Sequence, residues 1–319
     1  PAISYGHANG LGAELIFPEG GEVAHTHPFE ALSLEEATQR LRQPIDWETQ
    51  GVAPEQLACR DTMAVAFPGE AIGFGYGMEG PITTAYELLG ERLFTELHDG
   101  RDQMPAFLDA VADSIVDFHL WREAMAGRLR ADTVAATGAA DETTWGQVSG
   151  DASIDRSARA HPSPHAGGMV DDIASMVHPS MWPEMVMPSW DRYFDGITTG
   201  RRSAHVEDLR MEQLPYLEQI GLSSYDPSIS HKLTPPLIEA TIRVPFAWRL
   251  GCFHYMDLDE AAVRDWVLAA AADGASSVFT IIAESMCDGD SHVSRVHAFA
   301  EAGNEVAERL DAGDERQAL

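Results

Sequence analysis

A histidine, a glutamate and a cysteine have the types and spacing of a metal site. His205 and Glu207 are separated by one residue, so on an extended strand both side chains point to the same face and can bind one ion. Cys287 follows the apolar run 277–282, which is typical of a buried strand that ends shortly before the thiol. Imidazole, carboxylate and thiolate ligands suit zinc, with a fourth position open for a substrate. A solvated His–Glu pair and a cysteine packed in the core are the structural alternatives.

Three further positions favour substrate binding or proton transfer at strand ends. Asp172 follows one predicted strand, and Tyr225 and Asp226 end another. A carboxylate at such a position can orient a substrate or act as a base. The alternatives are a cap for the following turn at Asp172 and a turn before Pro227.

A glycine-rich turn at 77–83 precedes a predicted helix. Gly77 and Gly80 allow close approach of the backbone to a ligand, and Pro81 suits the first helical position. The helix start near Thr83 offers free N–H groups to a carboxylate or anion. We expect Gly77, Gly80 and Thr83 to contact a polar group of the substrate; a tight strand-to-helix turn without a ligand is the alternative.

A second pair with the same spacing, His25 and His27, is also a metal candidate. It precedes Pro28 in a predicted loop, which weakens the expectation of a site there.

Predicted strands and helices alternate along the chain and position these residues. Short strands are expected at 64–67, 71–74, 169–176, 242–246 and 277–282. Helices are expected at 34–41, 83–97, 104–128, 179–194, 214–220, 258–272 and 294–310. The alternation and the length of 319 residues predict an α/β fold, a single-domain (β/α)8 TIM barrel over residues 1–319. A doubly wound sheet is the alternative, but no Gly-x-Gly-x-x-Gly follows a strand.

A long stretch of low periodicity, Ala131 to Gly168, interrupts this pattern. It is rich in Ala, Thr, Gly, Ser and Asp. Loops of this length are usually functional lids or disordered segments, so we expect an insertion over the site.

Composition excludes several classes of function. The net charge is -30, from 51 acidic and 21 basic residues, which argues against nucleic acid as a partner. The longest apolar stretch is broken by Asp273 and Gly274, so no membrane span is expected. Three scattered cysteines and the absence of a signal pattern at 1–7 predict a cytoplasmic protein. The acidity also suggests adaptation to salt, with an ordinary acidic enzyme as the alternative.

Several short motifs occur in the order seen in the uroporphyrinogen decarboxylase superfamily. Gly-Pro-Ile-Thr-Thr-Ala at 80–85 resembles its Gly-Pro-Phe-Thr segment, and 170–172, 178–182 and 186–188 resemble its Asp-Asp, Ser-Pro and Leu-Pro string. His205-Val206-Glu207-Asp208 stands where the corrinoid and coenzyme M methyltransferases of this superfamily carry His-x-Cys-Gly, and Cys287 where they carry a second Cys. The similarity runs from about Gly10 to the C-terminus, interrupted by 131–168.

The resemblance implies a metal-dependent methyl or alkyl transfer to a thiol or from a methyl-corrinoid. It implies Zn2+, or Fe2+, held by His205, Glu207 and Cys287, with a corrinoid supplied by a partner protein. A homodimer is a candidate assembly. Two departures matter: the Arg-rich porphyrinogen motif is absent, and Glu207 replaces a Cys ligand. The alternatives are a metal-free decarboxylase or lyase with Arg202 or Arg243 as clamps, and a non-catalytic partner of a corrinoid protein.

Overall fold

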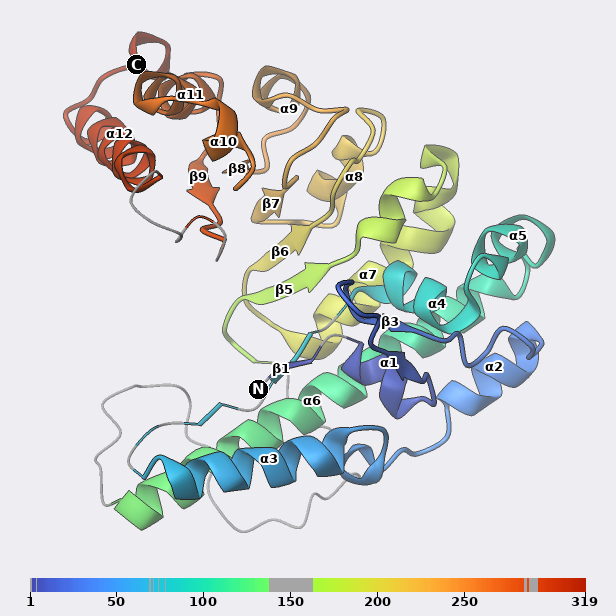
Figure 1. The fold of residues 1–319 in the computed structure, drawn as a ribbon. Helices are drawn as coiled ribbons and strands as arrows, with labels where there is room; N and C mark the ends of the chain where they lie inside the picture. Colours follow the sequence, from blue (N-terminus) through green and yellow to red (C-terminus); the bar gives the residue numbers. More distant parts are fainter. Residues whose placement is uncertain are drawn as a thin grey trace. The chain divides into compact units, whose positions relative to one another are not determined.

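The structure is a computed structural model of residues 1–319. It describes all residues except Pro1, Ser4, Gly69, Ala71, Phe74, Met78, 138–162, 284–285 and 287–291. Contacts between residues divide the chain into two units. Figure 1 labels most of the strands and helices of both units. Unit 1 comprises Pro1–Gly167 and Glu184–Gly200, and unit 2 comprises Gly168–Pro183 and Arg201–Leu319.

Unit 2 is built from neighbouring strands joined through helices. A three-stranded sheet has the order β5 (Gly167–Val170), β6 (Arg202–His205), β7 (Ser224–Asp226), and β8 (Ala247–Leu250) pairs with β9 (Ser277–Thr280). Both β6–β7 and β8–β9 are parallel pairs. A parallel bridge between Tyr225 and Phe246 links the two sheets. Parallel neighbours need a crossover connection, and helices provide it here.

Three helices of unit 2 lie within two residues of the ranges predicted at 214–220, 258–272 and 294–310, and two short helices, at 235–241 and 254–257, were not predicted. The segment after β5 forms two short 3-10 turns, η2 (Asp172–Met176) and η3 (Pro179–Met181). The α-helices are α8 (Leu214–Gln219), α9 (Pro235–Thr241), α10 (His254–Asp257), α11 (Glu260–Ala272) and α12 (Val293–Asp311). A 3-10 turn, η5 (Arg316–Ala318), follows α12. Pro215 lies in the first turn of α8, and Gly221 follows it with a φ of 74° that favours glycine. Asp259 caps α11 by accepting the Ala262 N–H.

Unit 1 is mainly helical. Its strands are the parallel pair β1 (Ala2–Ile3) and β4 (Gly75–Tyr76) and the antiparallel pair β2 (Leu15–Ile16) and β3 (Ala24–His25). Its helices are α1 (Gly6–Gly10), α2 (Leu34–Leu41), η1 (Trp47–Thr49), α3 (Ala53–Ala66), α4 (Pro81–Leu89), α5 (Arg92–Asp99), α6 (Met104–Thr137) and most of α7 (Trp182–Ile197). α6 buries Phe107, Val111 and Ile115, and α2 and α4 pack against it.

Several boundary predictions were wrong. The strand predicted at 169–176 ends at Val170, and the 3-10 turn η2 follows it. Residues 64–67 belong to the end of α3 and its cap, and Val65 is 82% exposed, because a short apolar run fits a helix as well as a strand. The strand predicted at 242–246 lies at Ala247–Leu250, after α9 ends. The insertion predicted at 131–168 is helical through Thr137 and extended from Gly167; its residues 138–162 lie outside the described part.

The mixed α/β class is confirmed, while the closed barrel is not shown. Across the residues that the structure describes, the strands form four small sheets and no closed eight-stranded one. The barrel and its single-domain extent therefore stay predictions.

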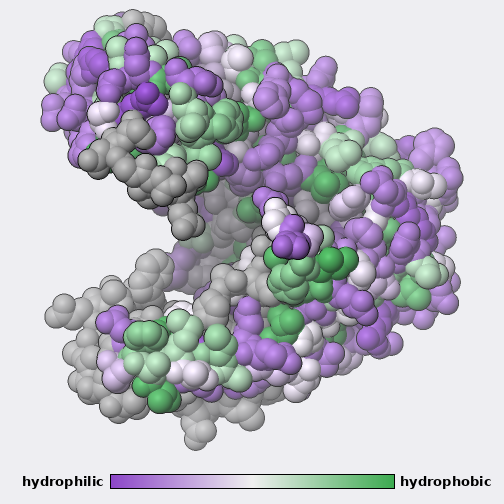
Figure 2. Space-filling model, in the orientation of Figure 1, coloured by the Kyte–Doolittle hydropathy of each residue, from purple (hydrophilic) through white to green (hydrophobic). Residues whose placement is uncertain are grey.

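The surface reflects the acidic composition. Hydrophilic side chains cover much of the face seen in Figure 2, and an apolar patch lies over the end of α3, where Val65 and Phe67 are exposed. No helix within the described ranges is long and apolar enough to span a membrane.

Candidate functional site

The centre of the site is a histidine held by a carboxylate on the neighbouring strand. The parallel register places His205, at the end of β6, opposite Asp226, at the end of β7. His205 Nδ1 lies 2.7 Å from Asp226 Oδ2. Because a carboxylate only accepts, Nδ1 carries the proton and Nε2 of the neutral ring keeps a free lone pair. The other Asp226 oxygen accepts the Ser228 N–H at 2.8 Å, which fixes the carboxylate.

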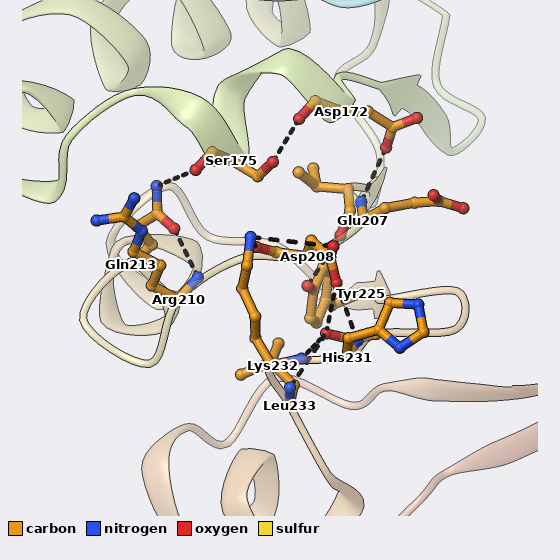
Figure 3. Close-up of polar contacts among 12 residues, drawn as sticks. Asp172, Ser175, Glu207, Asp208, Arg210, Gln213, Tyr225, His231, Lys232 and Leu233 are labelled. Atoms are coloured by element: carbon orange, nitrogen blue, oxygen red, sulfur yellow. Dashed lines mark hydrogen bonds and ion pairs between the residues drawn. The ribbon is translucent and has the colours of Figure 1, made fainter.

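Two more carboxylates face the free nitrogen of His205. Nε2 lies 3.8 Å from Asp172 Oδ1 and 3.7 Å from Glu207 Oε1. The Glu207 N–H donates to Asp172 Oδ1 at 2.8 Å, so the two acidic residues are linked through the backbone (Figure 3). The side chain of His205 is 24% exposed and that of Glu207 is 48% exposed. Solvent and small molecules can therefore reach the cluster.

The surroundings of His205 and Asp172 raise the pKa values of both side chains. The hydrogen bond with Asp226 raises the pKa of His205 above its ordinary value; the charges of Asp226, Asp172 and Glu207 raise it further, and burial opposes them. Burial raises the pKa of the Asp172 carboxyl, against the lowering effect of the Glu207 N–H and of His205. An easily protonated imidazole next to a carboxyl that holds its proton longer than usual can exchange protons with a substrate.

A buried glutamine positions the turn that carries Asp172. Gln213 is fully buried, and its Nε2 donates to the carbonyl of Val177 at 2.9 Å and to that of Ser175 at 3.3 Å (Figure 3). The Asp171 N–H donates to the His205 carbonyl at 3.0 Å. These bonds hold η2 against the end of β6, which places Asp172 beside His205.

Tyr225 supports the same strand end from inside. Its ring is 1% exposed, and its hydroxyl donates to the Val206 carbonyl at 3.0 Å. Burial raises the pKa of Tyr225 well above its ordinary value. The bond fixes the backbone between His205 and Glu207, which is a structural role; the predicted contact of Tyr225 with a substrate is not tested.

Asp208 ties the loop after β7 to this strand end. With a φ of 57°, it accepts the His231 N–H at 3.0 Å and the Ser230 hydroxyl at 3.1 Å (Figure 3). Lys232 Nζ donates to the Asp208 carbonyl at 3.0 Å. Asp208 therefore fixes the loop to the backbone that follows Glu207.

The structure brings together five of the predicted site residues: His205, Glu207, Asp172, Asp226 and Tyr225. Cys287, the predicted thiolate ligand, lies outside the described residues. Gly80 caps α4 and Pro81 is its first residue, as the sequence predicts, and this turn belongs to unit 1. A contact of Gly77, Gly80 or Thr83 with a substrate stays a prediction.

The donor atoms fit a metal in type, and the ligand set is incomplete in the described part of the chain. Among those residues, no group of three or more His, Cys, Asp or Glu side chains could hold a metal ion. Two ligands on a tetrahedral zinc ion lie about 3.4 Å apart. The separations of 3.7 and 3.8 Å from His205 Nε2 exceed this by a few tenths of an ångström. A metal-binding histidine commonly donates its other ring N–H to a carboxylate, as His205 does to Asp226.

Sequence reasoning missed two residues of this site. Gln213 gave no signal, because a glutamine before a helix has no distinctive pattern. Arg249, on β8, donates from Nη1 to Ser228 Oγ at 2.9 Å and so extends the hydrogen-bond chain that begins at Asp226. Arg249 gave no signal either, because its strand was predicted at 242–246 and lies at Ala247–Leu250.

Unit 1 contains a separate open groove of about 1060 Å³. Trp47 and Ile45 line it together with Asp113, Asp117 and Arg192. None of the predicted site residues lines it.

The comparisons with known proteins identify the fold and no family. The structure is similar to that of a methyltransferase from Methanosarcina mazei, with a TM-score of 0.58 and 14% sequence identity over 96% of this chain and 79% of the other. No protein-family model matches the sequence. No curated protein matches it either. At this identity the similarity shows a shared fold, in agreement with the α/β architecture described above.

Proposed function

We propose that this protein is a metal-dependent methyl or alkyl transferase that acts on a thiol or on a methyl-corrinoid. The observation that carries the proposal is the imidazole of His205, with Nδ1 bound to Asp226 and Nε2 facing Asp172 and Glu207. The fold shared with a methyltransferase supports the reaction class.

In this proposal His205 Nε2, Glu207 and Cys287 hold Zn2+ or Fe2+. When bound, the ion supplies a Lewis acid that lowers the pKa of a substrate thiol, so that the thiolate attacks carbon at neutral pH. Asp226 keeps His205 in the tautomer that presents Nε2. Asp172 lies beside the same nitrogen and, with its raised pKa, takes up the proton that the thiol loses.

A metal-free decarboxylase or lyase is the second candidate. The raised pKa values of His205 and Asp172 favour it, because an acid and a base are present without Cys287. Among possible substrate clamps, Arg249 reaches the hydrogen-bond chain at Ser228, whereas Arg202 donates to the Ile220 carbonyl at 3.0 Å and Arg243 is exposed. A corrinoid protein as partner, with or without catalysis, and a homodimer stay predictions.

A transfer assay with and without a chelator tests the proposal. Purified protein is incubated with methylcobalamin and a small thiol, and the thioether and the loss of the methyl-corrinoid absorbance are followed. We expect turnover to stop after treatment with a strong chelator and to return on adding Zn2+. A transfer activity that survives complete metal removal would contradict the metal-dependent mechanism.

The Asp172→Asn variant tests the proton acceptor of the proposed transferase. In the transferase it removes one proton acceptor but leaves the proposed metal ligands in place, so metal content should stay unchanged while the rate falls. Asp99→Asn, on an exposed carboxylate that pairs with His98, is the matched control and should change neither quantity.

A further inference from the structure

We propose that His25 and His27 in unit 1 form a second metal site, which takes a divalent transition-metal ion such as Zn2+. Both residues lie on one extended segment at the end of β3, so the i, i+2 spacing directs them to the same side. Their ring centroids are 5.2 Å apart and the ring planes meet at 82°. This proposal uses none of the residues of the proposed function and does not depend on it.

Backbone hydrogen bonds set both rings in the metal-binding tautomer. His25 Nδ1 lies 3.0 Å from the Thr26 carbonyl, and His27 Nδ1 lies 2.9 Å from the Glu87 carbonyl. A carbonyl only accepts, so each Nδ1 carries the proton and each Nε2 keeps its lone pair. Metal-binding histidines commonly donate their second ring nitrogen to a backbone carbonyl in this way.

The spacing of the rings agrees with a shared ion. Zn–N bonds of about 2.1 Å at a tetrahedral angle place the centroids of two Nε2-bound imidazoles about 5.2 Å apart. The centroid distance between His25 and His27 has this value. Edge-to-face packing of aromatic rings covers the same range of distances, so the spacing permits a shared ion and the hydrogen bonds at Nδ1 carry the argument.

The surroundings hold the two rings in place. Tyr5 packs on His25 with centroids 4.3 Å apart, and Tyr86 meets His27 at 5.6 Å. Gly90 has a φ of 63°, and a Cβ there would lie 2.9 Å from the His27 ring, so glycine leaves the space that this ring fills. The Thr26 N–H donates to the Glu14 carbonyl at 3.0 Å, which continues the β2–β3 pairing between the two histidines.

The site is accessible from solvent. His25 and His27 are both partly exposed, so an ion can enter from solvent. With two imidazole ligands and water in the remaining positions, the site should bind zinc more weakly than a site with three protein ligands.

Zinc titration of chelator-treated protein tests the site. Calorimetry on the wild type should show a weaker class of about one Zn2+ per chain besides any tight class. His25→Ala and His27→Ala should each lose the weaker class. His98→Ala is the matched control, since the side chain of His98 is 91% exposed and pairs with Asp99, and it should keep both classes.

A second measurement covers the case in which a variant does not fold. Adding Zn2+ to the wild type, followed by nitrogen-15 NMR of the imidazoles, should shift the Nε2 signals of His25 and His27 together. His205→Ala should leave this response intact, which separates a failure here from a failure of the proposed function. Unmoved His25 and His27 signals, or a weaker class that persists in both variants, would overturn the second site.

Discussion

Two histidines, His205 in unit 2 and His7 in unit 1, each make a single strong side-chain hydrogen bond, and their chemistry differs completely. His205 is bonded to the Asp226 carboxylate at 2.7 Å, and this bond raises its pKa. His7 Nε2 lies 2.9 Å from Ser114 Oγ, and its ring packs against Trp47 and Phe118 with 4% exposure. Burial lowers the pKa of His7 to about 3.

The contrast shows that partners and solvation, rather than the presence of a histidine, mark a reactive position. A carboxylate partner and access to solvent let His205 hold a proton or a cation. A hydroxyl partner inside an aromatic cluster keeps His7 neutral, so His7 packs as part of the hydrophobic core. The predictions below change the partner or the solvation of one histidine and leave the other as reference.

The largest effect should come from acid acting on His7. Its folded pKa is lower than the unfolded value of 6.5, so the unfolded state binds more protons below pH 6.5. Stability that is present above pH 6.5 is therefore lost as the pH falls toward 3, by up to about 1.4 kcal/mol per pH unit. Urea unfolding at pH 7 and pH 5 should show a loss of about 2 kcal/mol in the wild type that His7→Gln reduces. An identical pH dependence in both proteins would show that His7 is not kept neutral by the fold.

An effect of similar size is expected when the partner of His205 loses its charge. In Asp226→Asn the amide oxygen can still accept from Nδ1, but the negative charge is gone, so the pKa of His205 should fall. NMR titration of the imidazole measures this directly. Zinc affinity should drop about 10–100-fold, as is usual when the carboxylate behind a metal-binding histidine is changed.

Asp99→Asn is the control for this substitution, because the His98–Asp99 pair has a similar distance of 2.8 Å on an exposed surface. It should leave zinc affinity unchanged. Equal effects of the two substitutions would mean that Asp226 has no special relation to a metal.

The sequence predicted local features of both regions and missed how distant segments pair. The helix expected at 34–41 is present with the same bounds, and Ser33 and Glu36 form a capping box at its start, because both features involve neighbours along one helix. Asp172 and Asp226 were selected from their places at strand ends, and His205 and Glu207 from their spacing. That Asp226 is the partner of His205 depends on the register between β6 and β7, which no local pattern encodes. The partner that keeps His7 neutral is Ser114, 107 residues away.

The smallest and least local effect concerns salt. The net charge of -30 predicts self-repulsion among carboxylates, which salt screens. Raising KCl from roughly 0.1 M to about 1 M should raise the melting temperature by about 2 °C or more, equal to about 1 kcal/mol. The increase should be similar in the wild type and in His7→Gln, since it does not act through one histidine. A melting temperature that stays constant or falls with KCl would show that the acidic composition is not an adaptation to salt.

The most direct test of the central claim, that the His205 cluster binds a metal, is the metal content of purified protein after gel filtration. Elemental analysis should find about one tightly held Zn-like ion per chain in the wild type and in His98→Ala. His205→Ala and Cys287→Ser should each lose it, while both stay folded by circular dichroism. An unchanged metal content in both variants would contradict the account.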